Sequence, residues 1–414
     1  NELSELETFP ALQYIETLSL ADCEIDIGDL VIRCPFFNDL KDDASNLPSF
    51  LDQELETVIN KDSKRPSVPK DIVLYGFGRI GRLAARELIK QAGKGQQLRL
   101  KAIVVRRLTD AQIIKRADLL RNDSVHGAFK GVVDVDLANQ AIVVNGQVIK
   151  FIDGGNPEDI DYTIHGIDNA LLIDNTGAFT DKEALARHLE SKGVNKVLLT
   201  APGKGIPNIV YGINSKEIDV DSTDIFSAAS CTTNCLAPVA MVLEKNFGIE
   251  YGYMTTIHSY TGDQKLLDTL HKDLRRARAS GDSMIPTSTG AAKAMSLVLP
   301  SLNGKLDGTA IRVPTPNVSL IDFTVVTTKE VSPDNINNAM IEASKTKELK
   351  GILGINNKPL VSKDFNHNPH SSIFDVTQTQ VIKNKFSRVL SWYDNEWGFS
   401  NRMCETAIQI ATLI

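Results

Sequence analysis

The stretch DIVLYGFGRIGRLAARELIKQ, residues 71–91, decides the fold of the larger part of this chain. A β-branched apolar run leads into glycines in G-x-G-x-x-G spacing, and an amphipathic helical pattern follows them. A dinucleotide-binding unit requires this order of strand, glycine turn and helix, whereas glycine turns alone are common. Gly76 allows the tight turn, Gly78 lets the backbone approach a pyrophosphate, and Gly81 lets helix and strand pack closely. The helix N-terminus then presents amide hydrogens to the phosphates.

Further strand-like apolar runs follow this unit, separated by helical or turn segments. They are KAIVVRR (101–107), GVVDV (131–135), AIVVNGQVIKFI (141–152), NALLIDNTG (169–177) and NKVLLTAPG (195–203). This alternation predicts a parallel sheet with crossover helices. The longer strand patterns of 250–330 predict an antiparallel sheet. The sequence therefore predicts an α/β fold, with a Rossmann-type dinucleotide-binding domain and an α+β catalytic domain whose sheet is mixed or antiparallel.

The first 70 residues differ in character from the rest. They carry 15 acidic and 6 basic side chains, a balance of −9, while the remainder has a balance of +2. Residues 3–18 and 47–60 have apolar residues at helical spacing, and KDSKRPSVPK (61–70) is typical of a linker. We therefore expect residues 1–70 to form an acidic helical extension, with the domains of the main body after it.

Length and composition bound the class of protein. At 414 residues the chain is long enough for two or three domains. It has no apolar run of the ~18–20 residues that a membrane span needs, and no basic face typical of nucleic-acid binding. Five sparse cysteines and no recognisable leader favour a reducing, cytoplasmic location. The chain begins with Asn rather than Met, which leaves open a preceding targeting segment.

The motif SCTTNC, residues 230–235, contains two cysteines four residues apart. A metal site would need more ligands than His258 alone can add, and residues four apart on a helix lie at the edge of disulfide reach. A thiolate nucleophile fits better, because Cys231 follows a strand-like run and opens a helical pattern whose N-terminus lowers a thiol pKa. His258, on a later strand, could serve as its base. Cys235 then has the simpler role of a small buried group.

Two arginines end the second strand of the dinucleotide-binding unit. NAD-binding units usually have a carboxylate there to hold the ribose 2′-hydroxyl. Arg106 and Arg107 could instead bind the 2′-phosphate of NADP. The alternative is a pair of solvated side chains at the end of a strand.

Seven motifs in a fixed order give the chain a specific resemblance. SCTTNCLAP, HSYTGDQ, HKDLRRARA, PTSTGAAKA, GKLDG, RVPTPNVS and SWYDNEWGFSN resemble the phosphorylating glyceraldehyde-3-phosphate dehydrogenases, and the similarity runs from about Asp71 to the C-terminus. It implies an NAD(P)-binding domain at 71–230 completed by a C-terminal helix at about 396–414, a catalytic domain at 231–395, and a homotetramer. It implies no metal, and leaves residues 1–70 unmatched.

The resemblance also implies a reaction of glycolysis or gluconeogenesis. Cys231 attacks glyceraldehyde 3-phosphate, hydride passes to the nicotinamide, and inorganic phosphate releases 1,3-bisphosphoglycerate from the thioester, with His258 as the base. The substrate and attacking phosphates would be bound by Ser230, Thr232, Thr261, Arg276, Thr289, Gly290 and Arg312. The implied cofactor-binding residues are Gly76, Gly78, Arg79, Ile80, Gly81, Arg106, Arg107, Thr176, Gly177, Thr200 and Asn395.

Departures from the family pattern lie near the cofactor. Arg106 and Arg107 replace Asn-Asp of the NAD-specific members, Tyr75 replaces an Asn, and Phe399 replaces a Tyr near the nicotinamide. In LDTLHKDL, 267–274, a Thr-Leu pair replaces the usual Leu-Pro. Together these favour NADP, or both cofactors, over NAD alone. An erythrose-4-phosphate dehydrogenase and a regulatory binding protein on this fold are the alternatives, and the extension is a candidate site for a regulatory partner.

Overall fold

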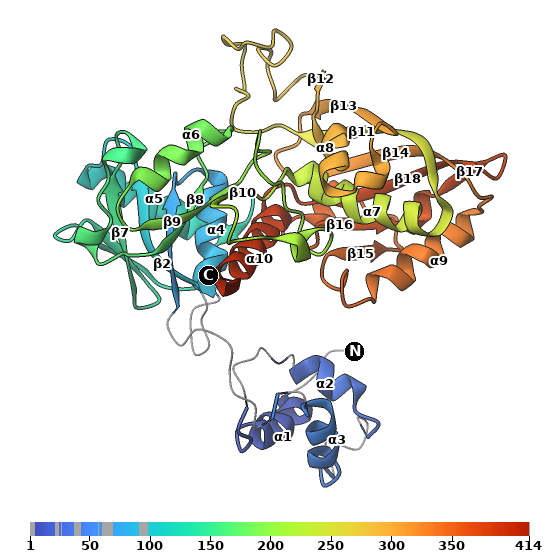
Figure 1. The fold of residues 1–414 in the computed structure, drawn as a ribbon, viewed down its shortest axis with the longest axis horizontal. Coiled ribbons are helices and arrows are strands. Elements are labelled where there is room, and N and C mark those ends of the chain that lie inside the picture. Colours follow the sequence, from blue (N-terminus) through green and yellow to red (C-terminus); the bar gives the residue numbers. More distant parts are fainter. Residues whose placement is uncertain are drawn as a thin grey trace. The chain divides into compact units, whose positions relative to one another are not determined.

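The computed structural model describes residues 5–20, 25, 27–36, 43–56, 58–59, 69–90 and 98–413 (Figure 1). The chain divides into two compact units. One comprises residues 1–69 with 93–97, and the other comprises 70–92 with 98–414. Each unit is described by itself.

The smaller unit is helical. Its helices are α1 (Glu5–Ile15), α2 (Ile27–Arg33) and α3 (Leu47–Glu54). They enclose a small apolar core that includes Ala11, Val31 and Leu51, each fully buried. Helices were predicted within 3–18 and 47–60, but α2 was missed because its seven residues are too few to show a clear period. Residues 61–68 of the predicted linker lie outside the described residues.

The first sheet of the larger unit has eight strands. Their order is β10 (Ile225–Ser227), β9 (Val194–Leu199), β8 (Ala170–Asp174), β1 (Lys70–Tyr75), β2 (Leu98–Val105), β7 (Gln147–Asp153), β6 (Ala141–Val144) and β5 (Val133–Asp136). The first six strands are parallel. The run 141–152 was wrongly predicted as one parallel strand: it is the β6–β7 hairpin, turning at Asn145 and Gly146, which both have positive φ.

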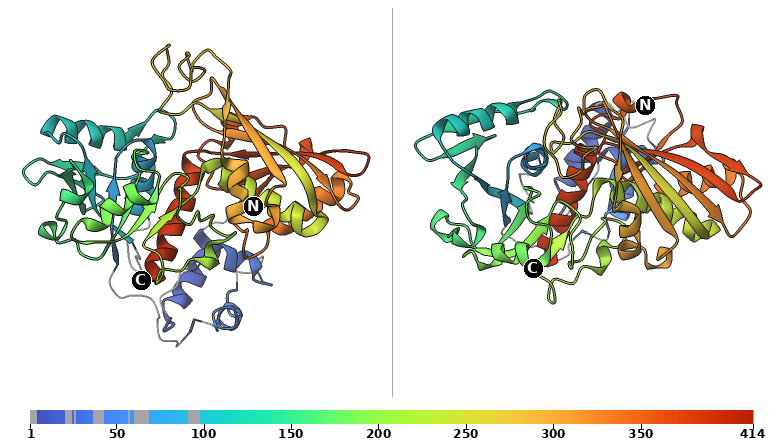
Figure 2. Two further views of the ribbon diagram at one scale, coloured as in Figure 1. Left: turned by 45° about the horizontal axis from the view of Figure 1, so that its top comes forward. Right: turned by 90° about the horizontal axis from the view of Figure 1, so that it is seen from above.

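Helices cover this sheet and connect it to the rest of the unit. Besides α4 (Arg79–Lys90), they are α5 (Asp110–Arg121), α6 (Lys182–Ala186) and α10 (Trp397–Leu413). Although α10 comes from the far end of the chain, its Met403, Ala407 and Ile410 belong to the same buried core as Ile72 and Leu74 of β1. Figure 2 shows α10 between the first sheet and the second. The C-terminal helix therefore brings the residues that precede it to the edge of the first sheet.

The second sheet is mixed. Its order is β12 (Ile285–Ser288), β13 (Leu306–Val313), β11 (Ile249–Ser259), β14 (Ser319–Thr327), β18 (Phe386–Tyr393), β16 (Ser372–Asp375) and β15 (Leu353–Asn356), and β17 (Gln380–Ile382) pairs with β18. The helices α7 (Cys231–Phe247), α8 (Ala291–Val298) and α9 (Pro333–Ser344) pack their apolar residues into its core. The antiparallel expectation for 250–330 is right for β11 and β14, but β11 and β13 are parallel. The two sheets confirm the predicted fold class.

A short two-stranded sheet, β3 (Asn122–Asp123) with β4 (Gly127–Ala128), completes the strands of the described residues. Among all the described residues, no helix is both long and apolar enough to cross a membrane.

Candidate active site

Cys231 is the first residue of α7 and sits at the point where the chain passes from the first sheet to the second. Ser230 caps the helix: its Oγ accepts the backbone N–H of Thr233 at 2.9 Å. The preceding residue, Ala229, has φ +58, so the chain turns sharply between β10 and the helix. This turn and cap fix the thiol at the positive end of the helix dipole.

His258 of β11 faces that thiol. Its Nε2 lies 3.6 Å from the Sγ of Cys231, and its Nδ1 lies 2.7 Å from the carbonyl oxygen of Ser259. The Nη1 of Arg312 lies 2.8 Å from the same Nδ1. In the tautomer that donates Nδ1–H to the Ser259 carbonyl, the Nε2 lone pair is directed at Cys231, as a general base requires. The thiol and the imidazole belong to residues 27 apart in the sequence, on α7 and β11.

The charges around this pair are set by burial and by one cation. Burial, followed by the charge of Arg312, lowers the pKa of His258 to about 3, so the imidazole is neutral at pH 7. Burial raises the pKa of the Cys231 thiol, and the Arg312 charge opposes this. The expected lowering of the thiol pKa is therefore outweighed by burial. In this state the pair is a thiol beside a neutral base.

Arg312 of β13 is paired in register with His258 of β11. Its Nη1 donates to the Ser259 carbonyl at 2.9 Å and lies 3.3 Å from the Oγ1 of Thr261. Arg276 lies near enough to lower the pKa of both Arg312 and His258, and its Nη1 is 3.3 Å from the carboxylate of Asp263. The Nε groups of both arginines are buried and have no hydrogen-bond partner among the described residues. Two cations with unused donors beside a nucleophile can bind anions.

The remaining predicted phosphate residues lie at two helix starts. Gly290 is the N-cap residue of α8, and the Oγ1 of Thr289 accepts the backbone N–H of Ala291 at 3.2 Å. Thr232 is buried in the first turn of α7, and its hydroxyl lies 2.9 Å from the hydroxyl of Tyr393. Thr289 thus has a partner in its own helix turn and Thr232 has one on β18, and neither has a hydrogen bond to Arg276 among the described residues.

Tyr393 was missed by the sequence reasoning. Its hydroxyl contacts Thr232 and Thr256, each at 2.9 Å, and its ring meets the His258 ring edge-on with 5.9 Å between centroids. Tyr393 thus lies in contact with both the His258 ring and Thr232 of α7. Its place in the motif SWYDNEWGFSN was the available signal.

The glycine loop fits a dinucleotide. Gly76 has φ +95, which few other residues adopt, and a Cβ on Gly81 would lie 2.6 Å from the carbonyl oxygen of Gly76. A Cβ on Gly78 would meet nothing within 4 Å. The first and third glycines thus form the turn and its close packing, while open space lies beside the second, at the start of α4.

Neighbouring loops at the carboxyl edge of the first sheet are held by Asp174. Its carboxylate accepts the backbone N–H and hydroxyl of Thr176, both at 2.7 Å, and Thr200 donates to its carbonyl at 3.0 Å. Gly177 follows with φ +68. The predicted residues Thr176, Gly177 and Thr200 are therefore brought together on one edge, where doubly wound sheets bind ligands.

Arg106 and Arg107 are exposed at the end of β2. Tyr75, which precedes the glycine loop, is paired in register with Val104, so the arginines lie directly beyond that edge. Arg107 has φ +58, and its backbone N–H donates to Asp153 at 2.9 Å. Burial raises the pKa of Tyr75, and the nearby charge of Arg106 opposes this.

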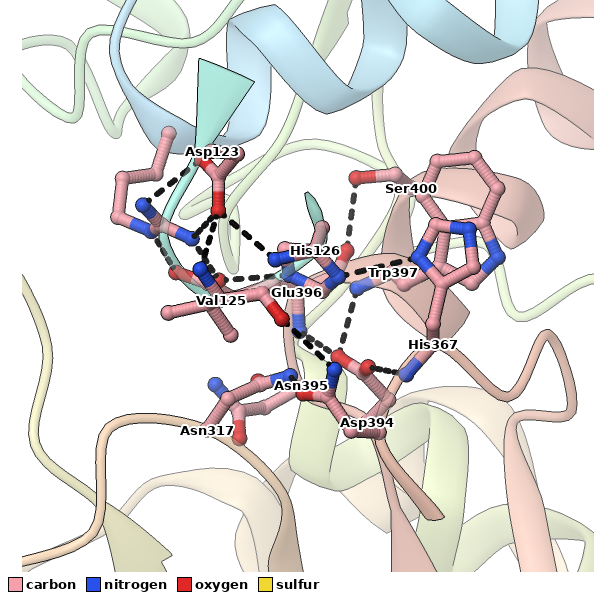
Figure 3. Close-up of polar contacts among 12 residues, drawn as sticks. Asp123, Val125, His126, Asn317, His367, Asp394, Asn395, Glu396, Trp397 and Ser400 are labelled. Atoms are coloured by element: carbon pink, nitrogen blue, oxygen red, sulfur yellow. Dashed lines mark hydrogen bonds and ion pairs between the residues drawn. The ribbon is translucent and has the colours of Figure 1, made fainter. Parts of the chain in front are cut away.

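Asn395 precedes α10 and is buried. Its Oδ1 accepts the hydroxyl of Ser319 at 2.8 Å. The next residue, Glu396, forms an ion pair with Arg79 of the glycine loop, which also pairs with Asp123 at 3.1 Å (Figure 3). Arg79, which was predicted to bind the cofactor, is therefore held by two carboxylates. One of them belongs to Glu396, the residue that follows Asn395. Ile80 is partly buried against the core of the first sheet.

Cys235 lies one turn along α7 and is fully buried. Burial raises its pKa to about 12, and both it and Cys231 are free thiols. The described residues include no group of three or more His, Cys, Asp or Glu side chains that could hold a metal ion. Of the two cysteines, only Cys231 faces a base.

A Rossmann-type sheet with a dinucleotide loop, next to a cysteine thiol that faces a histidine, is typical of a nicotinamide-dependent dehydrogenase. Comparison with known proteins narrows this class. The glyceraldehyde 3-phosphate dehydrogenase NAD binding domain matches residues 70–182, and the C-terminal domain of the same enzyme matches residues 230–395. The chain belongs to the glyceraldehyde-3-phosphate dehydrogenase family.

Individual relatives agree. The glyceraldehyde-3-phosphate dehydrogenase of Xanthobacter flavus is 50% identical over 83% of this chain and 98% of its own, and that of Zymomonas mobilis is 46% identical over 82% and 98%. A glyceraldehyde-3-phosphate dehydrogenase-like protein of Pseudomonas aeruginosa is 43% identical over 96% of this chain and 86% of its own. That alignment takes in most of the first 70 residues, which the sequence reasoning had left without a match.

Proposed function

We propose that this chain oxidises glyceraldehyde 3-phosphate with inorganic phosphate and NAD(P), giving 1,3-bisphosphoglycerate through a thioester on Cys231. The observation that carries the proposal is the 3.6 Å approach of the Cys231 thiol to the His258 imidazole, next to two arginines with unused Nε donors. A thiol and a base suit covalent attack on an aldehyde, and the arginines suit two phosphate dianions.

Each residue has a chemical role in this proposal. His258 takes the proton of Cys231 as the thiol adds to the aldehyde carbon and passes it to the former carbonyl oxygen, which becomes the hydroxyl of the thiohemiacetal. The imidazole, neutral again, then removes that hydroxyl proton as hydride leaves and the thioester forms. The bound nicotinamide supplies the hydride acceptor. Thr261 and Arg312 hold the substrate phosphate. The attacking phosphate is held by Ser230, Thr232, Arg276, Thr289 and Gly290.

The experiment compares initial rates with glyceraldehyde 3-phosphate and with erythrose 4-phosphate, each with and without inorganic phosphate. We expect the triose to be oxidised in a phosphate-dependent reaction and at the higher kcat/KM. A preference for erythrose 4-phosphate would mean that this sugar is the substrate of the protein. The absence of activity with both would support the regulatory-protein alternative.

For the cofactor, we propose use of NADP, alone or together with NAD. The support is that β2 itself is followed by the exposed side chains of Arg106 and Arg107 and not by a carboxylate. The same rate measurements with NAD and NADP in parallel test it, and strict NAD dependence would contradict it.

We also propose a homotetramer that works in the cytoplasm. The segment between β11 and β12 leaves large apolar side chains in water: Leu267 is 77% exposed, Leu274 is 82% exposed and Leu270 is fully exposed. Such a patch favours burial against another copy. Sedimentation should give the mass of four chains.

The helical extension exposes Phe9 and Phe36 and is proposed to contact a regulatory partner. Removal of residues 1–60, followed by a comparison of partner binding, would test this.

A further inference from the structure

A cavity of about 710 Å³ opens beside the C-terminal half of α4, away from the thiol. It lies within the larger unit, between α4, the segment after β4, the β6–β7 turn and the start of α10. Its size falls in the range of pockets that bind small molecules. It is lined by Arg86, Ile89, Lys90, His126, Ala128, Phe129, Lys130, Val144, Asn145, Gln147, His367 and Trp397.

The lining is cationic. Among the described residues its lining includes Arg86, Lys90 and Lys130 and no acidic residue. Arg86 is held in place by backbone carbonyls, since it donates to Leu120 and Gly127. Lys130 is exposed and has no acidic partner within the described residues. The ammonium group of Lys90 lies 3.6 Å from the carboxylate of Glu87, which is outside the lining, and the Lys90 side chain is 70% exposed. Three cations beside this one carboxylate leave a positive charge that attracts anions.

The other walls are apolar and aromatic. Ile89 and Val144 line the cavity with the rings of Phe129 and Trp397. The carboxamide of Gln147 donates to the carbonyl of Leu100 at 2.8 Å, while its buried Oε1 has no partner among the described groups. Flat apolar surface with a spare hydrogen-bond acceptor suits a heterocyclic ring that carries N–H groups.

The wall nearest α10 is rigidly built (Figure 3). The Nε2 of His126 is 3.0 Å from the carboxylate of Glu396, and its Nδ1 is 3.1 Å from the Nδ1 of His367. The His367 ring is stacked on Trp397, with 4.0 Å between centroids and 19° between planes. Glu396 is itself held by Arg79. A wall fixed by such contacts needs little reorganisation on binding.

We propose that this cavity binds a nucleoside phosphate, at a site separate from the cofactor cleft. The base lies against Phe129 and Trp397, and the phosphates meet Lys90 and Lys130. The inference rests on the cavity and its lining, and it does not depend on the proposed function.

The test uses the two tryptophans of the chain, Trp392 and Trp397. In the full-length Trp392→Phe variant, Trp397 is the only tryptophan, so its emission reports on the cavity. ATP is titrated in excess NAD and NADP, which fill the cofactor cleft, and adenosine and pyrophosphate are titrated separately. Calorimetry of the unsubstituted protein with ATP, under the same conditions, provides the measurement if Trp392→Phe does not fold.

We expect a saturable change in Trp397 emission with ATP, and binding at least tenfold weaker with adenosine or pyrophosphate alone. Substituting Lys90→Ala and Lys130→Ala together should weaken ATP binding by tenfold or more. The matched control is Lys150→Ala, a half-buried lysine of β7 outside the lining, which should leave ATP binding unchanged. The proposal is overturned if ATP does not bind, if pyrophosphate binds as tightly as ATP, or if the lysine substitutions have no effect.

Discussion

The Nε2 of His258 lies 3.6 Å from the Sγ of Cys231, while the other ring nitrogen is 2.7 Å from the carbonyl oxygen of Ser259. The Ser259 carbonyl and the Nη1 of Arg312, which lies 2.8 Å from the same nitrogen, thus orient the imidazole so that the opposite nitrogen meets the thiol. The neighbouring cation of Arg312 disfavours a positive charge on the ring. Base and nucleophile are placed before any ligand binds, which is the kind of preorganisation that covalent catalysis exploits.

Replacing Cys231 by Ser should abolish aldehyde oxidation, with kcat reduced by roughly 10³-fold or more, because the hydroxyl is a far weaker nucleophile at pH 7. The matched control is Cys235→Ser, four residues along the same helix. Cys235 faces Ser372 in the core and does not contact His258, so that variant should keep most of its activity. Equal losses in both variants would contradict the assignment of the nucleophile.

Replacing His258 by Asn should lower kcat by about 10²–10⁴-fold, the usual contribution of a general base. The thiol would lose its proton acceptor, while the phosphate residues stay in place. The KM for glyceraldehyde 3-phosphate should therefore change little. A raised KM with an unchanged kcat would show that the imidazole only helps to bind the substrate.

His258 should also make stability depend on pH. Its pKa is lowered to about 3 by burial, and a histidine in the unfolded chain has a pKa of about 6.5. Between these values the unfolded state binds the proton and the native state does not, so the free energy of unfolding falls as pH falls. The loss due to this residue should reach roughly 2–3 kcal/mol at pH 4.5. Urea unfolding at pH 7 and 4.5 should show a smaller loss in His258→Asn, and identical losses would refute this.

Substitution of Arg276 and substitution of Arg312 should each weaken the binding of a different phosphate. Arg276→Ala should raise the KM for inorganic phosphate about tenfold or more, and Arg312→Ala should raise the KM for glyceraldehyde 3-phosphate by a similar factor, because each removes a charge-assisted contact. Kinetics with each substrate varied in turn measure both constants. The solvent-exposed Arg275 provides the control, and Arg275→Ala should alter neither. Exchange of the two effects would reverse the assignment of the phosphate sites.

Substituting Arg106→Ala and Arg107→Ala together should weaken NADP binding by about tenfold and leave NAD binding nearly unchanged, since only NADP carries the 2′-phosphate. Equilibrium titration with each cofactor provides the two dissociation constants. An equal effect on both cofactors would mean that these arginines shape the loop and do not recognise the phosphate.

Glu396→Ala should destabilise the protein by roughly 1–3 kcal/mol, because it removes the carboxylate that both Arg79 and His126 contact. Arg79 keeps its pair with Asp123 and its side chain is 35% exposed, so the loss stays below that of a fully buried pair. Thermal unfolding checks this. Glu342→Ala is the control, since Glu342 pairs with Lys345 on the surface and is worth at most about 1 kcal/mol.

Local pattern predicted the elements that have a strong local signal. The strand, glycines and helix of 70–90 follow from residue types alone, as does the helix that begins at Cys231, because apolar period and glycine spacing are properties of short stretches. The β6–β7 hairpin also had a local signal, the Asn145–Gly146 pair, and it was overlooked. The parallel pairing of β11 with β13 had none, because the 46 residues between these strands do not determine their direction.

The site could be predicted only where family motifs identified its residues. Cys231 and His258 stand out by chemistry, but nothing local tells that Arg312 lies in register with His258 across two strands. Nor does local sequence show that burial outweighs the helix dipole at the thiol, or that Glu396 reaches back to Arg79 across 317 residues. These are tertiary relationships, and they follow from how α10 and the second sheet pack.

The central claim is a thioester on Cys231 that phosphate must release, and a rapid-mixing experiment tests it most directly. Full-length protein is mixed with glyceraldehyde 3-phosphate and oxidised cofactor in the absence of phosphate, and reduced cofactor is followed with time. We predict a burst of at most about one equivalent per chain that then stalls, and steady turnover when inorganic phosphate is added. Continuous turnover without phosphate, or no reduction of the cofactor at all, would contradict the account.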